Sequence, residues 1–172
     1  MQDLARLIRS VPDFPRAGVM FRDVSPLLAS AGAFARCIDA LAEPWQGQGI
    51  QAVGGIEARG FIFGAALALR LHAGFVPLRK PGKLPPPVHA VDYALEYGSD
   101  RLEIQHDVLR PGERVVLFDD VLATGGTLLA AAELTKRSGA ALIGAGVVIE
   151  LAALGGRSRW AERAPLHSLL RY

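Results

Sequence analysis

The segment that most constrains this chain is VVLFDDVLATGGT at residues 115–127, where an apolar run precedes two acids and several small residues. The run VVLF predicts a buried strand, and the glycines and threonines predict a turn that opens a helix. We expect the strand to end at Asp119 and Asp120, because neighbouring side chains of a continuing strand face opposite ways and could not both reach one ligand.

The small residues after the acids are suited to bind a phosphate. Backbone N–H groups at a helix start have no intrahelical partner, and the helix dipole favours an anion there. The P-loop pattern GxxxxGK[ST] and the dinucleotide pattern GxGxxG are both absent from this segment, which argues against nucleoside triphosphatases and dinucleotide enzymes. The two acids would bind vicinal hydroxyls and the loop a terminal phosphate, so the ligand that fits this segment is a ribose 5-phosphate. The alternative interpretation is that the segment is only a surface turn capped by Asp and Thr. The candidate loop residues are Ala123, Thr124, Gly125, Gly126 and Thr127.

Apolar runs alternate with helical patterns along most of the chain, which predicts an α/β fold with a parallel sheet covered on both faces. Strands are expected in QAVGGI, GFVPLR, VVLFDD and ALIGAGVVIEL, and helices at 3–10, 33–43, 60–72 and 127–139. Residues 80–100 interrupt the alternation with four prolines, and we expect an exposed, partly mobile excursion. Its flanks, YALEY and RLEIQ, are able to pair as a hairpin.

Composition narrows the class of protein. The length of 172 residues predicts one domain, and the net charge of +2, without a run of five basic residues, makes nucleic acid an unexpected partner.

Cys37 is the only cysteine and lies in a helical pattern, so we expect a buried thiol in a reducing compartment. The first thirty residues contain no long apolar stretch, so we expect no membrane association and a cytoplasmic location.

With these features in place, residues 115–127 resemble the motif by which type I phosphoribosyltransferases bind phosphoribosyl pyrophosphate (PRPP), and the rest of the chain resembles the members that act on adenine. Four further segments match in order: PDFPRAGVMFRDVSPLL the base-binding hood, EARGF the pyrophosphate loop, RKPGKLP with LEYG the catalytic loop, and VVIELAALGGR the segment closing the base pocket. The resemblance implies a central, mostly parallel sheet flanked by helices, within a single domain spanning 1–172. It also implies a hood at about 1–32, a flexible catalytic loop at about 80–102, and a homodimer.

The reaction that the resemblance implies joins adenine to PRPP, giving AMP and pyrophosphate in purine salvage. Because pyrophosphate is highly negative, its binding is expected to require Mg²⁺, held mainly by substrate oxygens, and cationic side chains. The resemblance gives these residues the following roles: Arg59, Arg79, Lys80 and Lys83 for pyrophosphate; Asp119 and Asp120 for the ribose; Glu96 as general acid or base; Tyr97 to position the loop; and Met20, Phe21, Arg22 and Leu151 for adenine.

Two alternatives remain open at this point. One is a phosphoribosyltransferase for another purine, such as xanthine, hypoxanthine or guanine, which would use the same PRPP residues. The other is a PRPP-sensing regulator without catalysis; the presence of Glu96 and Lys83 favours an enzyme. The four histidines, at 72, 89, 106 and 167, have no metal-ligand spacing and are expected to be structural or surface residues.

Overall fold

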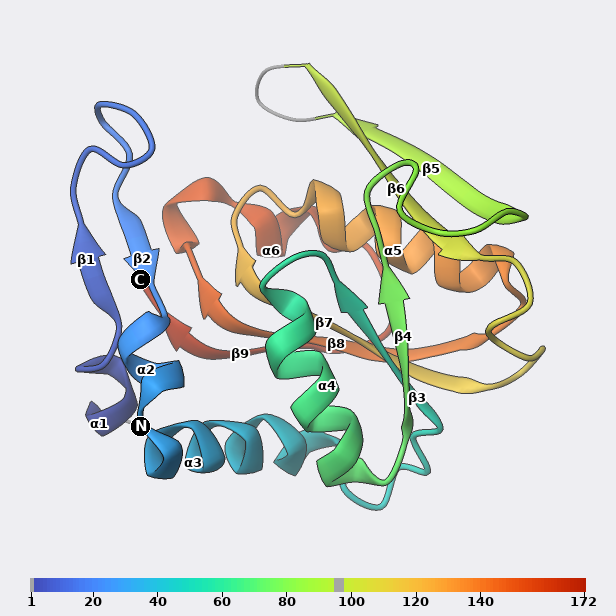
Figure 1. Ribbon diagram of the computed structural model, residues 1–172, viewed down its shortest axis with the longest axis horizontal. Coiled ribbons are helices and arrows are strands. Elements are labelled where there is room, and N and C mark those ends of the chain that lie inside the picture. The colour runs from blue at the N-terminus through green and yellow to red at the C-terminus, as the bar shows by residue number, and fades with distance from the viewer. Residues whose placement is uncertain (1, 95–97) are drawn as a thin grey trace.

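A five-stranded parallel sheet forms the centre of the computed structural model, which describes residues 2–94 and 98–172 (Figure 1). The strand order is β4-β3-β7-β8-β9. The bounds are β3 (Ala52–Ile56), β4 (Gly74–Leu78), β7 (Arg114–Leu122), β8 (Ala141–Glu150) and β9 (Leu166–Arg171). The expected α/β class with a parallel sheet is confirmed.

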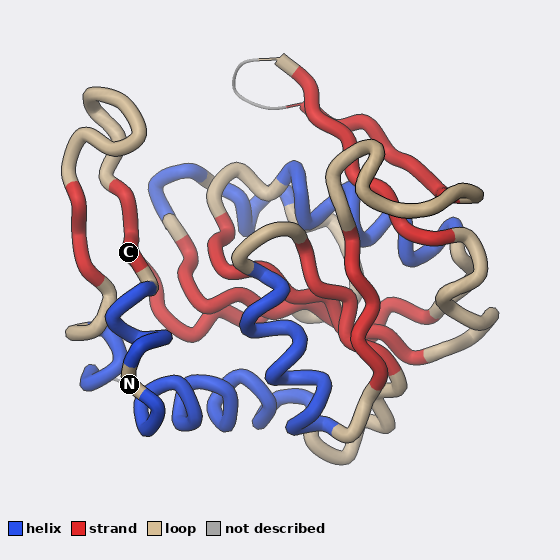
Figure 2. Tube along the Cα trace, in the orientation of Figure 1, coloured by secondary structure: helices blue, strands red, loops and turns tan. Residues whose placement is uncertain are grey.

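Helices cover both faces of this sheet, which explains why its central strands are continuously apolar (Figure 2). Helices α3 (Ala31–Ala42) and α4 (Gly60–Leu71) lie on one face, and α5 (Gly126–Arg137) lies on the other. The side chains of β7 alternate accordingly: Val116 and Phe118 belong to the core beneath α3 and α4, and Val115 and Leu117 to the core beneath α5. Cys37 is fully buried in the first of these cores, as expected, and burial raises the pKa of its thiol to about 12.

The N-terminal segment forms a hairpin beside the sheet. The predicted helix at 3–10 is too long, because α1 covers only Gln2–Ala5 before the chain enters β1 (Arg9–Val11). Strand β1 pairs antiparallel with β2 (Phe21–Asp23), and an Arg9–Asp23 ion pair of 2.5 Å ties the two strands together. The pairing of Arg9 explains the early end of the helix. Helix α2 (Ser25–Ala29) then leads into α3.

The proline-containing excursion is more regular than expected. Residues from Val88 onward form β5 (Val88–Ala94), which pairs antiparallel with β6 (Ser99–Gln105). A hairpin is therefore present, but the expected pairing of YALEY with RLEIQ is wrong, because residues 101–105 pair with Val88–Asp92. Tyr93, Leu102 and Ile104 are buried, which anchors the hairpin over α5 and the end of β4. The length of these two strands was not expected from the sequence, because the buried residues of the segment alternate with charged ones.

Three short elements complete the fold: the 3-10 helices η1 (Glu43–Trp45) and η2 (Ala152–Leu154), and α6 (Gly156–Arg159). None of the helices in the described part of the chain has the length and apolar character needed to cross a membrane.

Candidate functional site

The site lies where the strand order of the sheet reverses. From β3 the chain builds β4 on one side and, after the hairpin, β7 on the other, so the carboxyl ends of β3 and β7 are neighbours. Ligands of open parallel sheets bind at such switch points. Residues 57–59 follow β3, and the acids and the phosphate-type loop lie at the end of β7.

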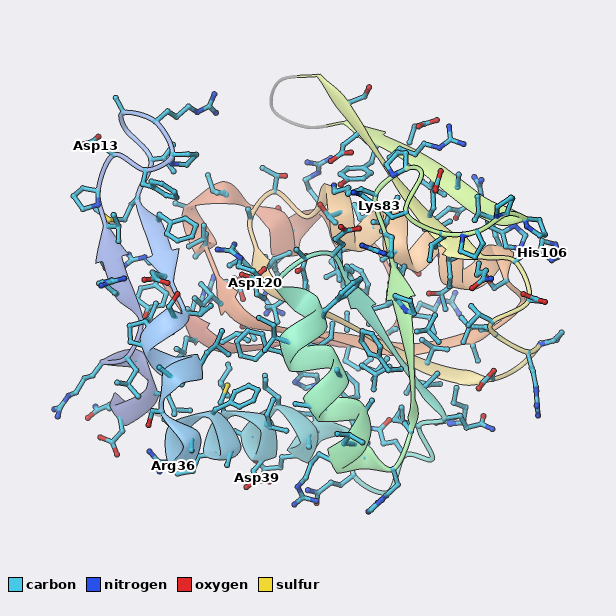
Figure 3. The ribbon with its side chains drawn as sticks, viewed as in Figure 1. Asp13, Arg36, Asp39, Lys83, His106 and Asp120 are labelled. Carbon is cyan, nitrogen blue, oxygen red and sulfur yellow. The ribbon has the colours of Figure 1, made fainter. Side chains whose placement is uncertain are left out.

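An ion pair joins these two strand ends. Arg59 precedes the first residue of α4, and its Nε lies 2.7 Å from Oδ2 of the buried Asp120. Figure 3 labels Asp120 near the start of α4. This Oδ2 has no hydrogen-bond partner in addition to the ion pair. Gly60 permits the close approach, because a Cβ there would lie 3.0 Å from both Asp119 Oδ1 and the Phe118 carbonyl oxygen. Arg59, Asp120 and Asp119 are therefore brought together, as the sequence predicted.

The backbone at the two acids differs from the prediction that the strand ends there. Strand β7 does not end at Asp119 but continues to Leu122, because β8 is long enough to pair with it as far as Leu122↔Glu150. The acids therefore lie within a strand. Asp120 extends toward α4 and Arg59, and Asp119 lines a small cavity at the start of α5.

Burial raises the pKa of both acids. The pKa of Asp119 lies well above its usual range, because the carboxyl is desolvated and the charge of Asp120 is adjacent. Desolvation also raises the pKa of Asp120, and the nearby Arg59 opposes this shift. Groups with raised pKa values contribute stability that is present at low pH and is lost as the pH rises through the folded-state pKa.

We therefore expect the substitution Asp119→Asn to stabilise the protein increasingly as the pH rises. The reason is that asparagine removes the cost of ionising a buried carboxyl, a cost that disappears as the pH falls below about 3, where aspartate is mostly protonated in both states. Urea denaturation of both proteins between pH 4 and pH 8 measures the difference in unfolding free energy. A difference that stays constant over this range would contradict the raised pKa.

The loop after β7 has the geometry expected of an anion site. Gly125 precedes α5 with a φ of +84°, and no side chain caps the helix, so the first N–H groups of α5 remain available. The loop lines a cavity of about 60 Å³, and a Cβ at Gly125 would lie 2.9 Å from the Gly156 carbonyl oxygen. The described residues around this cavity include Asp119, Ala123, Thr124, Gly125 and Thr127.

A larger cavity, of about 970 Å³, lies between the N-terminal hairpin and the carboxyl edge of the sheet. Met20 and Arg22 line it on the hairpin side, and Leu151 lines it on the sheet side. Ala123 and Thr124 line both this cavity and the small one, so the two are adjacent. Three residues that sequence reasoning missed also contribute to its wall: Ala153, Leu154 and Tyr172.

Phe21 lies on the other face of the hairpin from its neighbours. It lines a separate cavity of about 470 Å³, together with Phe14 and Arg59. Its ring centre is 5.1 Å from that of Phe14 and 5.0 Å from Cζ of Arg59. The alternation of side chains along β2 accounts for this separation. Phe21 thus contacts the residue that pairs with Asp120.

Besides Arg59, two more of the predicted pyrophosphate cations are bound by carboxylates. Arg79 donates from Nε and Nη2 to Glu57, at 3.2 and 3.3 Å. Lys80 donates to the Tyr93 hydroxyl, at 2.7 Å, and to Asp100 on β6. Sequence reasoning did not single out Glu57 or Asp100, although Glu57 lies inside the matched segment EARGF.

Among the remaining predicted residues of the catalytic loop, the structure describes Lys83. Lys83 is exposed in the loop that follows β4, where its carbonyl accepts a hydrogen bond from Arg79 Nη1 at 3.2 Å (Figure 3). Glu96 and Tyr97 lie outside the described residues, and their roles stay predictions.

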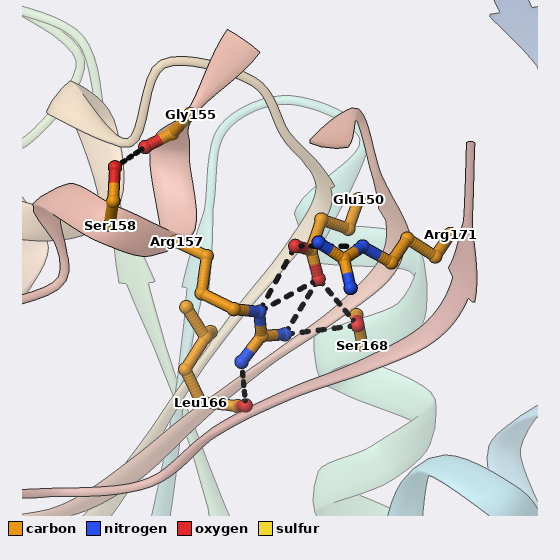
Figure 4. Close-up of polar contacts among 7 residues, drawn as sticks. All are labelled: Glu150, Gly155, Arg157, Ser158, Leu166, Ser168 and Arg171. Carbon is orange, nitrogen blue, oxygen red and sulfur yellow. Dashed lines mark hydrogen bonds and ion pairs between the residues drawn. The ribbon is translucent and has the colours of Figure 1, made fainter. Parts of the chain in front are cut away.

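A buried ion-pair network supports the segment that closes the larger cavity. Glu150 is only 2% exposed, and Arg157 donates to it from Nε and Nη2 (Figure 4). Arg157 also donates to the Leu166 carbonyl at 2.8 Å, and Ser168 donates to Glu150 at 2.7 Å. The hydrogen bonds from Arg157 keep the pKa of Glu150 below its usual value. This network fixes both ends of residues 151–156 to β8 and β9.

Replacing Arg157 with alanine is expected to lower the unfolding free energy by about 3 kcal/mol, because it leaves the buried Glu150 carboxylate without its main partner. Arg171 provides a matched control: it lies 3.6 Å from the same carboxylate, but 67% of its side chain is exposed. Arg171→Ala should therefore cost less than about 1 kcal/mol. Equal losses in the two variants, measured by urea denaturation, would refute the special role of Arg157.

Within residues 2–94 and 98–172, no three side chains of His, Cys, Asp or Glu are grouped in a way that could hold a metal ion. His89 and His106 stack with ring centres 4.4 Å apart, and desolvation lowers the pKa of His89.

Comparisons with known proteins agree with this geometry. The phosphoribosyl transferase domain family matches residues 25–163. The adenine phosphoribosyltransferase of Chloroflexus aurantiacus is 52% identical over 171 residues, which cover 99% of this chain and 98% of that protein. The crystal structure of the Rhodothermus marinus adenine phosphoribosyltransferase has a TM-score of 0.95 and 47% identity, covering 99% of this chain and 97% of that one. The Saccharomyces cerevisiae enzyme, solved with adenine and an imino-altritol bisphosphate, has a TM-score of 0.92 and 41% identity, covering 98% and 97%. The chain therefore belongs to the adenine phosphoribosyltransferase family.

Proposed function

We propose that this chain transfers the 5-phosphoribosyl group of PRPP to adenine, giving AMP and pyrophosphate, in the two adjacent cavities at the carboxyl edge of the sheet. The observation that carries the proposal is their shared wall. Ala123 and Thr124 border both the cavity at the start of α5 and the larger one beneath the hairpin. A nucleotide has the same two parts, a phosphate and a base, joined through a ribose.

PRPP is proposed to bind with its 5-phosphate on the N-terminus of α5 and its ribose near the two acids. The N–H groups of residues 125–127 supply donors to the phosphate, and the helix dipole adds to this attraction. Ionised Asp119 and Asp120 would accept hydrogen bonds from ribose hydroxyls. Arg59, already paired with Asp120, would meet the pyrophosphate on the adjacent side of the ribose.

The chemical step requires stabilisation of a leaving pyrophosphate. As its bond to the ribosyl carbon breaks, negative charge grows on the pyrophosphate, and preorganised cations lower the barrier. Arg59, Arg79, Lys80 and Lys83 are the proposed cations. Glu57 binds Arg79 and Asp100 binds Lys80 in the described conformation. The pyrophosphate of PRPP therefore has to bind these two cations beside the carboxylates or in their place. Glu96 is proposed to exchange a proton with the purine ring, with Tyr97 positioning its loop.

Mg²⁺ is the proposed cofactor, bound chiefly through PRPP oxygens. The donor chemistry near the proposed ribose site fits the ion, since carboxylate oxygens are hard ligands and Asp120 Oδ2 has no partner besides its ion pair with Arg59. Asp119 and Asp120 would hold its water ligands. When bound with PRPP, Mg²⁺ neutralises part of the charge on the pyrophosphate.

Adenine is proposed to lie in the larger cavity. The backbone groups of Met20 and Arg22 would pair with the amine and ring nitrogens, which selects against 6-oxopurines by leaving them with unmatched polar groups. Leu154 joins Leu151 as an apolar wall; it is 43% exposed, whereas Leu151 packs partly against the core. Phe21 stacking on the base would require it to reach around β2 from the neighbouring cavity.

Incubation of the protein with PRPP, adenine and Mg²⁺ tests the proposal. Chromatography should show AMP and pyrophosphate in equal amounts, and both should disappear when Mg²⁺ is chelated. PRPP binding without any product would favour the alternative of a PRPP-sensing protein. The cytoplasmic location, the homodimer and the single-domain organisation with its hood and mobile loop stay predictions.

A further inference from the structure

The last residue of the chain contacts the N-terminal hairpin. Cζ of Arg22, on β2, lies 4.1 Å from the centre of the Tyr172 ring, a close cation–π contact (Figure 1 shows the C-terminus beside β2). The two residues come from opposite ends of the sequence. Both line the cavity of about 970 Å³, so their contact links its hairpin side to its sheet side.

Tyr172 is held firmly in place by its main chain. Its N–H donates to the Glu150 carbonyl at 2.9 Å, and its own carbonyl accepts from the Ala152 N–H at 2.8 Å. These bonds fix it to the end of β8 and to the segment that carries Leu151 and Leu154. The ring, which lines the edge of the cavity, therefore extends from a fixed main chain and serves as a platform.

Arg22 depends on this platform. Its Nη1 donates to Ser10 on the same hairpin at 2.5 Å, and its buried Nε has no hydrogen-bond partner. The Tyr172 hydroxyl is likewise buried without a partner, so the face of the ring, and not the hydroxyl, makes the contact. The contact thus connects the hairpin to the sheet through one cation and one aromatic face.

We propose that Tyr172 is a positioning residue for base binding: through Arg22 it holds the backbone of residues 20–22 at a fixed distance from the Leu151–Leu154 wall. The inference rests on the proposed function, which places adenine in this cavity. Without the ring, the hairpin has to be ordered each time a base binds, and the apparent affinity falls by the fraction of competent conformers. The proposed PRPP residues lie on other elements, so PRPP binding is not affected.

Steady-state kinetics of three variants test this role. Tyr172→Leu should raise the KM for adenine about 3- to 30-fold, as expected for loss of a partly buried cation–π contact, with the KM for PRPP within about twofold of the wild type. Tyr172→Phe keeps the ring and should recover most of the adenine affinity. Arg22→Gln should match Tyr172→Leu, and the double variant should be no worse than either single variant.

An unchanged adenine KM in Tyr172→Leu would overturn the proposal, as would a Phe variant that loses as much as the Leu variant. Amide hydrogen exchange of residues 9–23 gives a readout that does not need activity: it should be faster in Tyr172→Leu and in Arg22→Gln than in the wild type and Tyr172→Phe. If the wild type makes no AMP, the proposed function fails, whereas the exchange measurement still decides the contact. Should Tyr172→Leu fail to fold, Arg22→Gln decides the outcome by the same two measurements.

Discussion

Replacing Arg59 with glutamine is expected to lower kcat/KM for PRPP by about 10²- to 10³-fold, the usual effect of removing one preorganised donor to a charge that grows in the transition state. Glutamine also leaves the buried Asp120 without its ion pair at 2.7 Å. The pKa of Asp120, already raised by burial, should therefore rise further and disfavour the ionised form that accepts ribose hydroxyls.

Arg70→Gln is the matched control, because Arg70 lies at the opposite end of the same helix and pairs with the exposed Asp39. Its kcat/KM should stay within about twofold of the wild type, as expected for an exposed ion pair. Stopped-flow or steady-state assays with varied PRPP give the comparison. An Arg59→Gln enzyme that keeps more than a third of the wild-type kcat/KM would remove Arg59 from the proposed mechanism.

Replacing Glu96 with glutamine is expected to lower the turnover number by about 10²- to 10⁴-fold, because proton transfer by a positioned group contributes about that much to the rate. PRPP binding should remain nearly unchanged. Turnover is measured at saturating adenine and PRPP, and PRPP affinity by calorimetry. Asp92→Asn, on β5, controls for the loss of a carboxylate nearby in the sequence, since the Asp92 side chain is 70% exposed. Unchanged turnover in Glu96→Gln would show that another group moves the proton.

The sequence predicted the features that depend on local patterns. Continuous apolar runs identified β3, β4, β7 and β8, because central parallel strands are buried on both faces. The phosphate-type loop was found from its small residues at a helix start, and Arg59 from its place after a buried strand. The family resemblance placed Met20, Phe21, Arg22 and Leu151 around one base; Met20, Arg22 and Leu151 do line one cavity, whereas Phe21 lines a neighbouring one.

Other features could not be seen in the sequence because they depend on contacts between distant segments. Strand β7 continues past Asp119 because β8 is available to pair with it, which no pattern within 115–127 reveals. Arg9 and Asp23 pair across a hairpin, so a helical pattern at 3–10 ends early. The contact of Tyr172 with Arg22 joins the two ends of the chain. The exposed, partly buried and fully buried residues of strand β9 follow no regular alternation, so its six residues could not be distinguished from a loop.

The charges around the ribose site form a coupled group. Asp120 is bound to Arg59, and Arg59 in turn lies 5.0 Å from the Phe21 ring on the hairpin. Arg59 therefore contacts both Asp120, at the end of β7, and the hairpin residue Phe21.

The most direct test of adenine phosphoribosyl transfer is a competition among purines at limiting PRPP and excess Mg²⁺. Equal concentrations of adenine, hypoxanthine, guanine and xanthine are supplied together, and the nucleotides are separated by chromatography. AMP is expected as the dominant product, since the proposed backbone partners match the adenine amine and would leave 6-oxopurines unpaired. Nucleotides formed from the 6-oxopurines, with adenine left unused, would contradict it.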